Sequence, residues 1–87
     1  MQIRELRDLK RKDVPLAYRR TFTAEAVLDG ENSGETRQPV EFDLEQTAAG
    51  TTQVKIRLIG SARYPVIPLM RALHAYITTM HARGKLN

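Results

Sequence analysis

Cysteine and tryptophan are absent from this chain of 87 residues, and aromatic residues make up only 6% of it. Without cysteine there can be no disulfide framework and no thiolate zinc site, and nothing argues for an oxidising compartment. No apolar run approaches the roughly 20 residues of a membrane span, and the first residues are charged without the apolar stretch of a secretory signal. The sequence therefore predicts a single cytoplasmic domain over residues 1–87 without a membrane partner.

Motifs that hold nucleotides or metals are also missing. Neither Gly-x-x-x-x-Gly-Lys nor Gly-x-Gly-x-x-Gly occurs. His74 and His81 are seven residues apart, roughly 10 Å along a helix, which is too far to share one metal ion. Ser33 and Ser61 have no histidine or acid placed beside them by sequence. We therefore expect no enzyme, no metal and no cofactor. The alternatives are a histidine that acts as a ligand or general base, and an anion site at residues 61–63 before a helix.

Charge is distributed unevenly along the chain. Residues 1–20 hold seven Lys or Arg against three acids, residues 21–50 hold one against seven, and residues 51–87 hold six against none. A basic head, an acidic middle and a basic tail can neutralise one another within one fold. The net charge of +4 is therefore weaker support for nucleic-acid binding than it first suggests.

The strongest periodic signal is a helix over Tyr64–Arg83. Its apolar residues recur at the i, i+3, i+4, i+7 spacing of one helix face, and an isolated amphipathic helix is marginal in water, so a sheet must cover this stripe. Pro65 and Pro68 suit the first turn, and Gly84 suits the position just after the end. The stripe consists of Leu69, Met70, Leu73, Tyr76, Ile77 and Met80.

Three stretches alternate polar and apolar residues and are predicted to be strands: Tyr18–Leu28, Val40–Gln46 and Gln53–Ile59. Residues 29–38 contain no apolar side chain and are expected to form a polar loop. The last two strands suit a hairpin in which Leu44 faces Val54, Phe42 faces Ile56 and Val40 faces Leu58. This register also sets Asp43 opposite Lys55 and Glu41 opposite Arg57, so these acids are interpreted as surface ion pairs.

The N-terminal segment 2–12 is predicted to be a short helix, because Ile3, Leu6 and Leu9 recur every three residues and Pro15 would end it. The alternative is a flexible basic arm over residues 1–13. The expected fold is α+β: a three-stranded antiparallel meander with the C-terminal amphipathic helix packed on one face, in αβββα order. This order resembles the topology of the double-stranded-RNA-binding domain, whose lysine-rich helix start is replaced here by residues 64–68, YPVIP.

Two functions follow as hypotheses. The first is a non-enzymatic interaction or adaptor module, a homodimer or the binder of a protein partner, because one helix cannot easily cover all the apolar residues. These extra residues are Val14, Leu16, Val27, Ile59, Val66 and Ile67. The second is a small RNA- or DNA-binding protein that uses a basic N-terminal patch, with Tyr18 or Tyr64 for base stacking. The patch would comprise Arg4, Arg7, Lys10, Arg11, Lys12, Arg19, Arg20 and Arg63.

Overall fold

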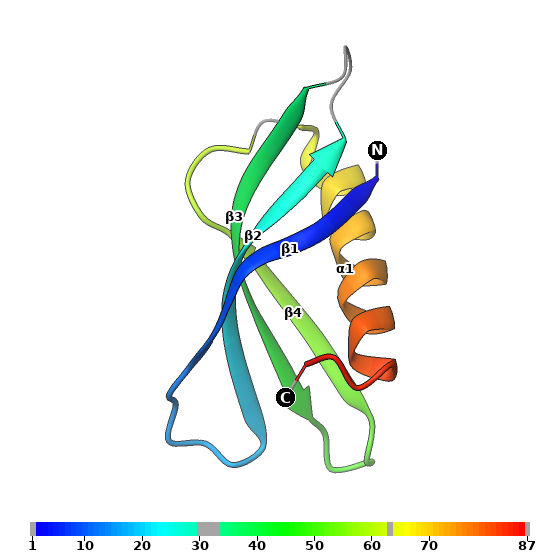
Figure 1. Cartoon of the computed structure of the whole chain (residues 1–87). Helices are drawn as coiled ribbons and strands as arrows, with labels where there is room; N and C mark the ends of the chain where they lie inside the picture. The colour runs from blue at the N-terminus through cyan, green and yellow to red at the C-terminus, as the bar shows by residue number, and fades with distance from the viewer. Residues whose placement is uncertain (1, 30–33, 63, 87) are drawn as a thin grey trace.

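A computed structural model describes residues 2–29, 34–62 and 64–86. Within them, four antiparallel strands in the order β1-β2-β3-β4 form one sheet, and a single helix follows. The helix lies along one face of a strongly twisted, elongated sheet (Figure 1), and the molecule measures 44 × 22 × 21 Å. The elements are β1 (Ile3–Lys12), β2 (Arg19–Asp29), β3 (Glu35–Gln46), β4 (Thr52–Leu58) and α1 (Val66–Ala82).

The predicted αβββα order is wrong, because the N-terminal segment is a strand. Both the helix over residues 2–12 and the flexible arm are replaced by β1, which pairs with β2 along its length. The likeness to the double-stranded-RNA-binding topology therefore disappears as well. The fold is α+β with the order ββββα.

Bulges in β1 explain why its sequence suggested a helix. Ile3 pairs with Leu28 and Leu6 pairs with Ala26, so three residues of β1 span two of β2. The extra residue of a bulge thus sets the inward side chains three apart, which imitates helical spacing. A second irregularity between Arg7 and Lys10 contains Asp8 in the left-handed conformation, with φ of 55°.

The hairpin of β3 and β4 has the register that the sequence predicted. Phe42 pairs with Ile56, Asp43 with Lys55, and the remaining predicted pairs follow along the ladder. Strand β3 begins at Glu35, however, so the expected loop over 29–38 is wrong for residues 35–38, and residues 30–33 lie outside the described part. Pairing with β2 gives this polar stretch its strand conformation, a long-range effect that local composition does not report.

The core lies between α1 and the facing side of the sheet. Leu69, Leu73 and Ile77 of the predicted helix stripe are fully buried. Phe22 and Phe42 stack at 5.2 Å between ring centroids, with 19° between their planes. Leu86, beyond the helix, is also buried in this core. The β4 residues expected to meet the helix are only partly buried: Val54, Ile56 and Leu58.

The C-terminal end of α1 is closed as its sequence indicates. Gly84 has φ of 70°, a left-handed conformation that suits glycine. Its amide donates to the carbonyl of His81, and the amide of Lys85 donates to the carbonyl of Met80. This pattern turns the chain back toward the sheet, so that Leu86 reaches the core and the last residues lie near the start of β2.

Leu73→Ala is expected to lower the free energy of unfolding by ~2–5 kcal/mol, because Leu73 is 0% exposed and the change leaves a cavity. Urea denaturation followed by circular dichroism measures the loss. Thr78→Ala, on the exposed side of the same helix, is the matched control and should change stability little. Equal stabilities of the two variants would contradict this packing of α1.

Candidate functional site

Three acidic side chains form a row on the face of the sheet opposite the helix. Glu41, Asp43 and Glu45 alternate along β3 with the core residues. Asp43 is only 4% exposed and accepts hydrogen bonds from Arg57 at 2.9 and 3.0 Å. Thr21 of β2 donates a further hydrogen bond to Asp43 at 2.7 Å. The carboxylate of Asp43 is therefore held from both neighbouring strands.

Cations flank the other two acids of this row. Glu41 accepts from Lys12 of β1 at 2.6 Å and from Arg57 at 3.1 Å. Glu45 lies 3.2 Å from Arg19 of β2 and 3.4 Å from Lys55 of β4. The interpretation of these acids as surface ion pairs is confirmed, and the pairing extends across all four strands.

These hydrogen bonds shift the titration of the acids. The bond from Arg57, more than burial or Thr21, determines that the pKa of Asp43 lies below its ordinary value. The bonds from Lys12 and then Arg57 lower the pKa of Glu41. Both carboxylates are therefore ionised at neutral pH, which suits an ion-pair network and not a proton-transfer site.

Matched charges leave a surplus elsewhere. Among the described residues, seven cations and seven acids take part in ion pairs within 4.0 Å. Asp8 and Asp13 are the two described acids outside these pairs. Six described cations lie outside them as well, so the surplus of four positive charges belongs to this unpaired set: Lys10, Arg11, Arg20, Arg71, Arg83 and Lys85.

The residues of the predicted basic patch are divided by the structure. Four of them are ion-paired: Arg4 with Asp29 and Glu35, Arg7 with Glu5 and Glu35, Lys12 with Glu41, and Arg19 with Glu45. Lys10, Arg11 and Arg20 take part in no ion pair with the described residues, and Arg63 lies outside that part of the chain.

Arg11 and Arg20 lie on the helix side of the sheet. Arg11 is the cross-strand partner of Phe22, and Arg20 is the partner of Leu44. Both partners belong to the core, and cross-strand partners point to the same face. Lys12, next along β1, points to the opposite face and reaches Glu41. Alternation along a strand thus prevents the adjacent cations from forming one patch.

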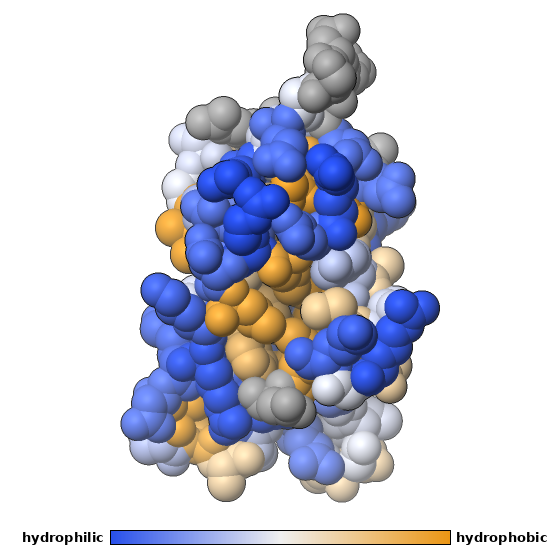
Figure 2. Space-filling model, in the orientation of Figure 1, coloured by the Kyte–Doolittle hydropathy of each residue, from blue (hydrophilic) through white to orange (hydrophobic). Residues whose placement is uncertain are grey.

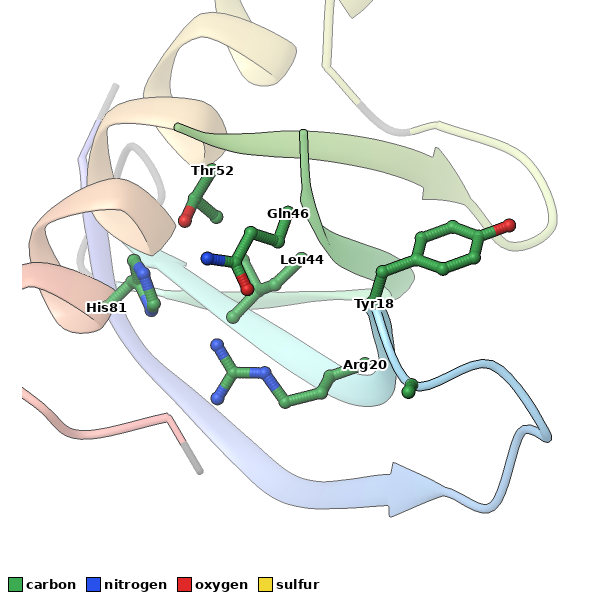
Figure 3. Close-up of a pocket in the computed structure, with 7 residues that line it drawn as sticks. Tyr18, Arg20, Leu44, Gln46, Thr52 and His81 are labelled. Atoms are coloured by element: carbon green, nitrogen blue, oxygen red, sulfur yellow. The ribbon is translucent and has the colours of Figure 1, made fainter. Parts of the chain in front are cut away.

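A polar pocket of about 280 Å³ lies where the C-terminal end of α1 approaches the sheet. Three elements line it: the start of β2, the turn between β3 and β4, and the last turn of α1. In Figure 3 the Arg20 guanidinium, the Gln46 amide and the His81 ring are directed into the same space, while the Tyr18 ring is turned away. Sequence reasoning missed this site, because its residues are up to 61 positions apart, from Arg20 to His81.

A shallow apolar groove lies between β4 and the first half of α1. Val54 and Ile56 line the strand side, and Met70, Arg71 and His74 line the helix side. In the view of Figure 2, charged and polar residues cover most of the surface, with an apolar strip across the middle. Apolar side chains therefore reach the surface in bands between the charged regions.

The histidines occupy different surroundings. His74 is exposed beside the groove, and His81 is half-buried beside the pocket. In the described ranges no three His, Asp or Glu side chains are grouped to hold a metal ion. The helix over these ranges is also not long and apolar enough to cross a membrane.

Asp43→Asn is expected to lower the free energy of unfolding by about 1–2 kcal/mol at pH 7, because Arg57 loses a charged partner but remains half-exposed. A lowered pKa means that the stabilisation is present above the ordinary carboxyl values, 3.8 for Asp43 and 4.5 for Glu41, and is lost as the pH falls through the lower folded values. Thermal unfolding between pH 7 and pH 2 measures this loss.

The exposed Asp13 is the matched control, since it takes part in no ion pair with the described residues. Asp13→Asn should leave the acid-induced loss of stability as it is in the parent protein, whereas Asp43→Asn should make it shallower. An identical pH profile for Asp43→Asn and the parent would contradict the role of this carboxylate.

Comparison with known proteins gives one family. No curated protein and no solved structure matches the sequence. A family model described as the BB_0187 family matches residues 1–82. This range includes all four strands and the whole of α1. The chain therefore belongs to this family.

Proposed function

We propose that this protein is a non-enzymatic interaction module that self-associates through the edge of β4. The observation that carries this proposal is the contrast between the two edges of the sheet. Strand β1 has two irregularities along its pairing with β2, whereas the pairing of β4 with β3 runs without a shift over all seven residues. Bulges protect a sheet edge from further pairing, so β4 is the edge open to another strand.

Apolar side chains next to β4 add to this edge. Val54, Ile56 and Leu58 point toward the core side but are only partly buried. Ile59 after the strand is 47% exposed, and Val66 and Ile67 at the start of α1 are 53% and 67% exposed. A second copy that extends the sheet would cover the strand edge and these side chains together, which favours self-association through burial of apolar area.

Charge on β4 does not prevent this arrangement. In a two-fold antiparallel pairing of β4 strands, Lys55 and Arg57 of one copy lie opposite cations of the other, and like charges across a ladder are destabilising. Each of these cations already has an acidic partner in its own sheet, Glu45 for Lys55 and Asp43 for Arg57. The ion pairs therefore reduce the repulsion between the two copies.

Ile67→Glu is expected to convert a dimer into a monomer, because it places a charge in the apolar surface beside β4. Sedimentation velocity over a range of protein concentrations measures the change. Leu16→Glu, at a residue 37% exposed in the β1–β2 connection, introduces the same charge away from β4 and should leave the dimer intact. A parent protein that stays monomeric at high concentration would refute the proposal.

The charge surplus favours a second function, binding of single-stranded nucleic acid. Its support is that the paired cations and acids are equal in number, so the unpaired cations carry the net charge. Arg11, Arg20, Arg83 and Lys85 are gathered at one end of the molecule, because the segment after α1 packs back toward β2. Cations without acidic partners are available to phosphate groups, which attract them strongly.

Neutralising these four residues to Gln should abolish binding of a labelled single-stranded oligonucleotide, and the affinity of the parent should fall steeply with salt. Fluorescence anisotropy at several salt concentrations measures both effects. The matched control neutralises four ion-paired cations, Arg4, Arg7, Lys12 and Arg19, and should retain most of the binding once circular dichroism shows that it is folded. Equal losses in the two variants would contradict a role for the unpaired set.

A further inference from the structure

The pocket at the C-terminal end of α1 is lined by hydrogen-bond donors and lacks acids. Its polar lining includes the side chains of Arg20, Gln46, Thr52 and His81, and no Asp or Glu is among its lining residues. Arginine presents five N–H donors and no acceptor, and an amide, a hydroxyl and an imidazole can each donate as well. Such a lining disfavours a cation and suits a ligand that offers several oxygen acceptors.

Arg20 is held in place without using its charge. Its Nη1 donates to the main-chain carbonyl of Leu86 at 3.1 Å. Leu86 is 3% exposed and packs in the core, so this carbonyl has a defined position. Arg20 is not ion-paired with any described residue. The bond to Leu86 uses one of five donors and leaves the others, with the full positive charge, beside the pocket (Figure 3).

His81 has a buried nitrogen without a partner. Its Nδ1 is inaccessible to solvent and makes no hydrogen bond within the described part of the chain. Leaving a buried polar group unpaired is unfavourable, so such an atom in a polar pocket calls for a partner from outside the protein. A small movement of the half-buried ring would bring a nitrogen to a ligand in the pocket.

The main chain fixes the remaining wall. The amide of Gln46 donates to the carbonyl of Tyr18 at 2.8 Å, which joins the end of β3 to the residue before β2. Thr52 opens β4 directly across the ladder from Gln46. Donors thus come from β2, from the β3–β4 hairpin and from α1, which is an arrangement for a three-dimensional anion and less so for a planar carboxylate.

We propose that this pocket binds a phosphate group, with Arg20 and His81 as the charged or chargeable ligands and Gln46 and Thr52 as neutral donors. The phosphate can be free, carried by a small phosphorylated molecule, or located at the end of an oligonucleotide. The site does not depend on self-association, because all of its residues come from one copy of the chain.

Titration of the full chain with inorganic phosphate, followed by two-dimensional amide NMR and by calorimetry against chloride at equal ionic strength, tests the site. We expect saturable shifts for Arg20, Gln46, Thr52 and His81. Arg20→Gln should weaken phosphate binding at least about tenfold, since charged hydrogen bonds are the strongest in such a site. Thr52→Val, which preserves shape and changes no charge, should weaken it less, so that one variant remains informative if Arg20→Gln is unfolded.

Arg71→Gln is the control, because Arg71 is an unpaired arginine of the same helix that lines the groove and not this pocket. It should bind phosphate as the parent does. The proposal is overturned if phosphate binds no better than chloride or acetate, or if both Arg20→Gln and Thr52→Val bind it unchanged. Comparison of 5′-phosphorylated and 5′-hydroxyl oligonucleotides separates the sources: a preference for the former assigns the site to a nucleic-acid terminus, and equal binding assigns it to a small phosphate compound.

Discussion

Strand β3 divides this molecule into a dry face and a charged face. Its alternation sets Val40, Phe42 and Leu44 against the helix and three acids on the opposite side. Asp43 is nearly buried although it is charged, which is tolerable only because Arg57 and Thr21 supply hydrogen bonds. The same strand therefore requires a helix on one side and cations from its neighbours on the other.

The acid row has a consequence for the rest of the surface. Because it is paired with cations from β1, β2 and β4, much of the basic character of the chain is used within the sheet. The remaining cations include Arg20, which lies on the helix side and lines a pocket rather than a ladder of ion pairs. Charge neutralisation on one face thus concentrates the unmatched positive charge on the other.

The edges of the sheet differ in a way that composition does not reveal. Both β1 and β4 are rich in cations, and charged side chains are one means of protecting an edge. Only β1 also has bulges, one of which contains the left-handed Asp8. Strand β4 keeps a regular ladder beside a partly covered apolar groove, so its protection is less complete.

The sequence by itself determined the C-terminal helix, its end at Gly84, and the register of the β3–β4 hairpin. In each case a local repeat or a nearby pair of alternating strands contains the whole of the physical signal. Expected ion pairs such as Asp43 with Arg57 followed from the same register. The apolar core could also be named in large part, because burial follows directly from the periodic stripes.

Only the tertiary structure decided the conformation of β1 and the first part of β3, and with them the number of strands. A bulge changes the spacing of inward residues from two to three, and local sequence cannot distinguish that pattern from a helix. The phosphate pocket is likewise invisible in sequence, because Arg20, Gln46 and His81 meet only after three elements have packed. Short-range periodicity reports which face of an element is buried, whereas long-range pairing decides which elements, and hence which charges, lie together.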